Sequence, residues 1–75
     1  MIKIPFKIEQ LRAGDTITQP RCGEKGEVQR LLIVDVTYDL VRVIVLLDAL
    51  GHGWTGKLLS FAKIEIDTDK WRLLC

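Results

Sequence analysis

The residues best suited to chemistry lie in one glycine-rich segment, 51–56, which holds the only histidine, His52, and one of two tryptophans, Trp54. Imidazole has the unperturbed pKa nearest neutrality, so His52 is the first candidate for acid–base catalysis. A catalytic histidine needs a nucleophile or an orienting carboxylate within hydrogen-bonding distance. Neither Asp48 nor Thr55 forms a recognised arrangement with it in the sequence, and we expect a solvated loop histidine.

The indole of Trp54, at the tip of a predicted loop, has two alternative roles. It either folds back over the end of the core, which we favour, or is offered to a partner, because tryptophan often carries binding energy at interfaces. We therefore predict that His52 and Trp54 belong to a partner-binding surface. Trp71 alternates with Leu73 on a predicted strand, and we expect its indole in the core.

Other patterns of catalysis or metal binding are absent from the sequence. It has no P-loop, nucleophile elbow or dinucleotide fingerprint, and its C-terminal acidic residues lack the spacing of a calcium loop. Most carboxylates fall at predicted turns, where they would cap or solvate the backbone: Asp35, Asp39, Asp48, Glu65, Asp67 and Asp69. We predict a protein that is not an enzyme and that uses no cofactor and no metal.

A second candidate site is basic and would contact nucleic acid through phosphate charge and base stacking. Its residues are Arg21, Lys25, Arg30 and Tyr38. The basic residues of this region are interleaved with acidic ones, and 11 Lys and Arg against 10 Asp and Glu leave a net charge of +1. So weak a field favours a protein partner over nucleic acid or an anionic membrane. Nucleic-acid binding is therefore the alternative prediction.

Length and composition predict one small domain over residues 1–75, since 48% of the residues are hydrophobic and 28% are charged, which argues against disorder. The longest run of Val, Ile and Leu, residues 43–47, is far shorter than the roughly 18 residues of a membrane span. The N-terminus lacks a signal-peptide pattern. Cys22 and Cys75 show neither metal-site nor disulfide-framework spacing. We expect a cytoplasmic protein with free thiols.

Apolar residues recur with a period close to two, which indicates strands. β-branched residues crowd the centre and disfavour a helix there. Because Pro5 cannot donate a ladder hydrogen bond, the first strand should lie at a sheet edge. The predicted strands are 2–8, 16–19, a hairpin between 27 and 50 with its turn at 37–39, 57–61, 64–66 and 71–74. The fold class is all-β: a small, strongly bent antiparallel barrel of five to seven short strands.

Both faces of the central hairpin are apolar. One parity is assigned to the core: Val28, Leu32, Val34, Val36, Val41, Val43, Val45 and Leu47. The other parity then faces outward: Leu31, Ile33, Leu40, Ile44 and Leu46. Because so small a domain cannot easily bury this surplus, either barrel closure or a second subunit must cover the outer face. We predict a homodimer or another protein partner that binds at Leu31, Ile33, Ile44 and Leu46.

Three segments carry a family resemblance: Gly-Asp-Thr-Ile at 14–17, Gly-Glu-Val at 26–28 and Leu-Ser-Phe-Ala-Lys-Ile-Glu at 59–65. In this order they resemble the SH3-like barrels of the KOW type over residues 14–66. The resemblance implies an SH3-like barrel. It also implies the functions that such barrels host, which are RNA binding, accessory roles in ribosomes and polymerases, and docking as a small subunit.

The predicted function is a small non-catalytic binding module, or accessory subunit, that contacts another protein through the apolar outer face of the hairpin. An RNA- or DNA-binding module of the KOW type is the first alternative. A short phage or mobile-element protein that acts on a host factor is the second, and it fits the size of the chain.

Overall fold

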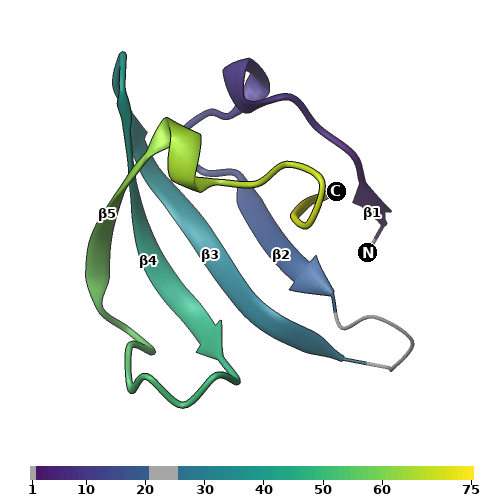
Figure 1. The fold of residues 1–75 in the computed structure, drawn as a ribbon, viewed down its shortest axis with the longest axis vertical. Helices are drawn as coiled ribbons and strands as arrows, with labels where there is room; N and C mark the ends of the chain where they lie inside the picture. The colour runs from purple at the N-terminus through teal and green to yellow at the C-terminus, as the bar shows by residue number, and fades with distance from the viewer. Residues whose placement is uncertain (1, 21–25) are drawn as a thin grey trace.

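The computed structural model describes residues 2–20 and 26–75. Six strands form one antiparallel sheet in the order β1-β6-β2-β3-β4-β5 (Figure 1). The strands are β1 (Lys3–Ile4), β2 (Thr16–Pro20), β3 (Glu27–Val36), β4 (Leu40–Asp48), β5 (Leu58–Ala62) and β6 (Arg72–Leu74), and two turns of 3-10 helix are η1 (Ile8–Gln10) and η2 (Lys63–Glu65). The predicted all-β class is confirmed. Within the described residues, no helix has the length and apolar character needed to cross a membrane.

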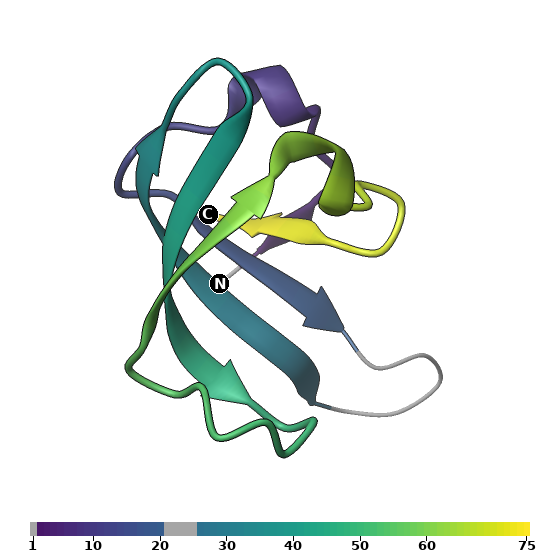
Figure 2. The ribbon, with the colours of Figure 1, turned by 60° about the vertical axis from the view of Figure 1, so that its left-hand side comes forward.

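The sheet is strongly curved, but it does not close. β1 and β5 are its two edges, and no strand pairing joins them in the described part of the chain. After β5, residues 63–71 pass over the concave side and lead to β6, which pairs with β2 (Figures 1 and 2). Ile66 and Trp71 on this segment are buried in the core. Side chains rather than a closed ladder of hydrogen bonds therefore cover the concave side.

The first strand lies at an edge, as Pro5 predicts, but it is shorter than expected. The chain turns into η1 after Lys7, whose backbone N–H donates to the side-chain oxygen of Gln10 at 2.9 Å. Phe6 and Leu11, on either side of this turn, are buried in the core. Of the alternating apolar residues in 2–8, only Phe6 is buried, whereas Ile2 is 67% exposed.

The expectation that Leu31 and Ile33 face outward is wrong. Both side chains are buried, with 2% and 1% exposed, and they lie opposite Val45 and Val43 on β4. Bulges interrupt the β3–β4 register between Arg30 and Leu31 and between Ile33 and Asp35. A bulge changes the face that a given parity occupies, so parity counted along an all-apolar strand does not identify the core face.

The outer face carries a different apolar row. Leu32, Ile44 and Leu58 lie directly opposite one another on β3, β4 and β5. Four residues that are 39–43% exposed extend this outer row: Val34, Leu40, Leu46 and Leu47. Ile44 and Leu46 thus lie on the outer face as predicted, whereas Leu32, Val34 and Leu47 were wrongly assigned to the core.

The strand expected at 64–66 is the turn η2 instead. The Glu65 carboxylate accepts the backbone N–H of Ala62 at 3.0 Å, and Ile66 N–H donates to the Lys63 carbonyl at 3.2 Å. The turn leaves Ile64 94% exposed and buries Ile66.

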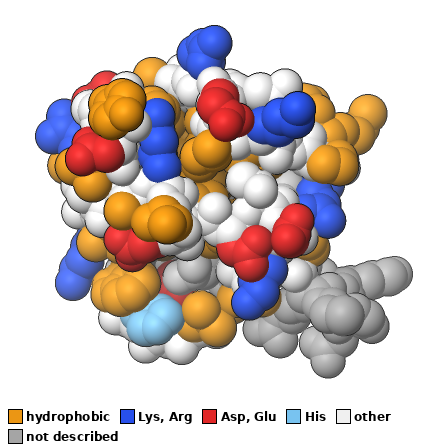
Figure 3. Space-filling view, turned by 45° about the horizontal axis from the view of Figure 1, so that its top comes forward, with side chains coloured by type: hydrophobic (Ala, Val, Ile, Leu, Met, Phe, Trp, Pro, Cys, Tyr) orange, Lys and Arg blue, Asp and Glu red, His pale blue; other side chains and the backbone are white. Residues whose placement is uncertain are grey.

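On the face shown in Figure 3, acidic and basic side chains are mixed with hydrophobic ones.

Candidate functional site

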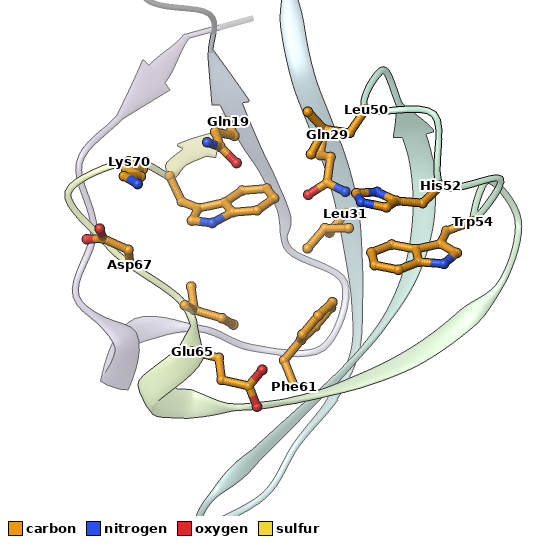
Figure 4. Close-up of a pocket in the computed structure, with 12 residues that line it drawn as sticks. Gln19, Gln29, Leu31, Leu50, His52, Trp54, Phe61, Glu65, Asp67 and Lys70 are labelled. Atoms are coloured by element: carbon orange, nitrogen blue, oxygen red, sulfur yellow. The ribbon is translucent and has the colours of Figure 1, made fainter.

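A cavity of about 310 Å³ opens on the concave side of the sheet (Figure 4). β2, β3, the loop between β4 and β5, β5 itself and residues 63–71 all contribute to its lining. The lining residues include Leu31, His52, Trp54, Phe61, Glu65 and Trp71. The volume lies at the lower end of the range for ligand sites, which combine apolar walls with a few polar groups.

One buried carboxylate fixes the loop between β4 and β5. The Asp48 side chain is inaccessible to solvent. Its Oδ2 accepts the backbone N–H groups of His52 at 3.1 Å and Trp54 at 3.4 Å, and its Oδ1 accepts the N–H of Leu50 at 3.2 Å. The Gln29 amide on β3 donates to Oδ1 at 3.3 Å. Asp48 therefore ties the loop to the sheet, in agreement with its expected role as a backbone cap.

His52 and Trp54 form a stacked pair on this loop. Their ring centroids lie 4.0 Å apart with an angle of 13° between the planes. Gly51 and Gly53, on both sides of His52, have φ angles of +82° and +73°. Only glycine adopts this backbone conformation without strain, so the glycine spacing allows the two rings to come together.

Asp48 also orients the imidazole, which the sequence did not lead us to expect. Its Oδ1 lies 3.4 Å from Nδ1 of His52. Burial of the Asp48 carboxyl opposes its ionisation, but the hydrogen bonds from Gln29, Trp54, His52 and Leu50 outweigh burial and lower the pKa of Asp48 below its ordinary value. The ionised carboxylate is thus the stable form in this loop.

A buried carboxylate that holds an imidazole resembles part of a catalytic triad. Among the described residues, however, no hydroxyl or thiol is hydrogen-bonded to His52. Nor do residues 2–20 and 26–75 contain three His, Cys, Asp or Glu side chains placed to hold a metal ion. The arrangement therefore fixes the position of two aromatic rings.

Trp54 folds back against the core cluster, as we favoured from the sequence, and also lines the cavity. Trp71 is buried in the core and reaches the cavity from the other side. Leu31 lines the cavity as well, which gives it a different role from the one predicted. Ile33 contributes only to the core, and Ile44 lies on the outer face of the sheet.

The structure describes two residues of the alternative basic site, and it does not bring them together. Arg21 and Lys25 lie outside the described residues. Arg30 forms an ion pair with Glu27, and Tyr38 lies in the turn between β3 and β4, 96% exposed. Arg30 lies on β3, and Tyr38 lies beyond the end of this strand at Val36.

The Glu27 carboxylate connects Arg30 to a buried hydroxyl. It accepts hydrogen bonds from the Arg30 guanidinium and from Thr18, whose side chain is fully buried. The bond from Arg30 is the main cause that lowers the pKa of Glu27 below its ordinary value, despite partial burial. Arg30 is therefore already committed to an ion pair within the sheet.

Sequence reasoning missed Phe61, Glu65 and the link between Asp48 and His52. Their spacing along the chain gives no sign that they meet, because the meeting depends on the curvature of the sheet. Comparison of the chain with protein-family models, with curated proteins and with solved structures gives no match.

Proposed function

We propose that the protein is a non-catalytic binding module that holds a segment of another protein in the cavity on its concave side. The observation that carries the proposal is the aromatic wall formed by His52 and Trp54, which Asp48 holds in place through hydrogen bonds to the loop backbone. A side chain that is already ordered loses less entropy on binding. Tryptophan is also among the residues that contribute most at interfaces.

The lining favours a basic anchor side chain in the partner. Indole faces attract cations, and both Trp54 and Trp71 line the cavity. Glu65 uses Oε1 to accept the Ala62 N–H, which leaves Oε2 without a hydrogen-bond partner in the described part of the chain. A guanidinium can stack on an indole and bind a carboxylate at once. We therefore propose a partner segment that presents an arginine.

The charges around the cavity agree with this choice but are modest. Glu65 and Asp67 contribute two carboxylates, and Lys70 contributes one ammonium. Long-range attraction of a basic partner is therefore weak. We expect the affinity to depend mainly on stacking and on the contact with Glu65, and only slightly on salt.

The outer apolar row of Leu32, Ile44 and Leu58 supports the same class of function, because exposed apolar patches mark protein contacts. An accessory-subunit role and a cytoplasmic location belong to this proposal. An SH3-like affiliation belongs to it too.

Selection from a displayed peptide library tests the proposal. Trp54 and Trp71 are the only tryptophans and both line the cavity, so intrinsic fluorescence follows its occupation. We expect selected peptides to contain arginine and to bind Trp54→Ala at least about tenfold more weakly, or ~1.4 kcal/mol. Tyr38→Ala, an exposed aromatic in a distant turn, is the matched control and should bind as the wild type does.

Two results would contradict the proposal. One is a selection that enriches no peptide. The other is a set of peptides that bind the wild type and Trp54→Ala equally, since these would bind elsewhere. The nucleic-acid alternative predicts oligonucleotide binding that weakens steeply with salt, and the absence of any binding at low salt would exclude it.

A further inference from the structure

We propose that the protein forms a symmetric homodimer in which β5 pairs antiparallel with β5 of a second copy. β5 is one edge of the sheet and pairs only with β4 in the described part of the chain (Figure 1). The proposal concerns a different surface from the cavity, and it does not rest on peptide binding.

The hydrogen bonds at the two ends of β5 show which of its backbone groups face β4. At one end Val45 N–H donates to the Lys57 carbonyl at 3.1 Å, and at the other Lys63 N–H donates to the Asp39 carbonyl at 2.9 Å. Bonded positions alternate along an antiparallel pair. Leu59 and Phe61 therefore direct their backbone groups toward β4.

The residues between them direct their backbone groups away from the sheet. Leu58 and Ser60 have outward N–H and C=O groups with no hydrogen-bond partner among the described residues. At Ala62 the outward N–H is occupied by the Glu65 carboxylate at 3.0 Å. Two adjacent outward positions are thus left with two donors and two acceptors, the set that one antiparallel partner strand satisfies.

The two edges of the sheet differ in how they are protected. β1 has only two residues and is followed by Pro5, and both features discourage pairing with another chain. β5 has the sequence Leu-Leu-Ser-Phe-Ala, with no proline and no charged side chain, and its register with β4 contains no bulge. Of these two edges of the described sheet, the β5 edge is therefore the one open to an incoming strand.

A second copy satisfies this edge in one register in particular. If Leu59 lies on the two-fold axis, Leu58 faces Ser60 of the second copy, and four backbone hydrogen bonds form. The Ala62–Glu65 bond is kept, and Lys57 faces Phe61 of the second copy. A register centred on Ser60 would instead place Lys57 against Lys63, and like charges in opposite positions are unfavourable.

The apolar row on the outer face ends at the β5 edge. Leu58, the end of the row that runs from Leu32 through Ile44, is 58% exposed. In the Leu59-centred register the two Leu58 side chains are diagonal neighbours, a position from which long side chains make contact. The two rows then join across the interface, and the net charge of +1 gives little repulsion between copies.

The variant Ser60→Pro tests dimer formation without removing a hydrogen bond from the fold of the monomer. The N–H of Ser60 takes no part in the β3–β4–β5 ladder, so proline there removes no hydrogen bond within the chain. It blocks pairing with a second copy. Ser60→Thr is the control, because it keeps the N–H. We expect sedimentation equilibrium to show dimers for the wild type and Ser60→Thr at high micromolar concentration and monomers for Ser60→Pro.

Amide hydrogen exchange of the wild type tests the same contact without any substitution. Protection of the Leu58 and Ser60 amides should rise with protein concentration, whereas the Leu59 and Phe61 amides should be protected at every concentration. A wild-type monomer at millimolar concentration overturns the proposal. So does a dimer that persists in folded Ser60→Pro, or exchange at Leu58 and Ser60 that does not depend on concentration.

Discussion

The carboxylate of Asp48 lies 3.4 Å from Nδ1 of His52, and the two side chains differ completely in exposure: that of Asp48 is 0% exposed and that of His52 is 40% exposed. A buried anchor thus holds an exposed ring, and the ring is stacked on Trp54. Because the same carboxylate accepts three backbone N–H groups of the loop, one side chain controls the whole aromatic wall of the cavity.

We predict that Asp48→Asn lowers the melting temperature and weakens binding in the cavity. The asparagine amide has one oxygen in place of two and adds two donors where donors already converge. Thermal unfolding followed by tryptophan fluorescence measures the change. Asp35→Asn is the control, because its carboxylate is 46% exposed and lies 3.6 Å from Arg42, a pair worth at most about 1 kcal/mol. Equal melting temperatures for the two variants would contradict the role of Asp48.

Folding stability should fall in acid because of Glu27. Its folded-state pKa is lowered from an ordinary value of 4.5, mainly by the hydrogen bond from Arg30. A carboxyl with a lowered folded pKa stabilises the fold fully above its unfolded pKa, and this contribution is lost as the pH falls through the folded pKa. We expect urea midpoints that are nearly constant from neutral pH down to the unfolded value and that decline below it.

The variant Glu27→Gln should flatten that decline, although Asp48, whose pKa is also lowered, will retain part of it. Glu9→Gln, at an exposed carboxyl in η1, serves as the control. If the urea midpoint of Glu27→Gln declined with falling pH as steeply as that of Glu9→Gln, the Glu27–Arg30 pair would not contribute to acid sensitivity.

Local sequence patterns were sufficient to predict the positions of most strands. The alternation of residues 27–50 and the turn between them predicted the long hairpin β3–β4, and Pro5 predicted the edge position of β1. The inward face of β3 could not be predicted, because apolar residues occupy both parities and two bulges change the register. The choice of face is a tertiary property, set by what packs on each side.

The cavity could not be predicted from the sequence, for a related reason. His52 and Trp54 stand out through the glycines around them, and both were selected as binding residues. Phe61 and Trp71 read as ordinary strand residues, yet the curved sheet and the returning segment 63–71 bring them to the same cavity. The role of Asp48 depends on a loop conformation that no short motif encodes.

Alanine substitutions of Leu31 and Leu32 test which face of β3 packs in the core. They are adjacent residues of the same type, but only Leu31 is buried, with 2% exposed. We expect Leu31→Ala to cost about 2–5 kcal/mol, as for other buried leucines, because it leaves a cavity. Leu32→Ala should cost less than about half as much. Denaturant unfolding gives both values, and the reverse order would restore the inward assignment of Leu32.

The same comparison on β4 tests whether the outer apolar row is uncovered in the isolated chain. Val43 is 0% exposed and Ile44 lies on the outer face between Leu32 and Leu58. Threonine keeps the β-branched shape that suits a strand. Val43→Thr exchanges one methyl group for a hydroxyl, and Ile44→Thr places a hydroxyl on the outer face and also removes the terminal methyl group. At Val43 the hydroxyl is buried, at a cost of about 1–3 kcal/mol. At Ile44 it meets water, so the free energy of unfolding should change by less than about 1 kcal/mol, while binding of an apolar dye falls. An equal loss of stability in both variants would mean that the outer face is already covered within one chain.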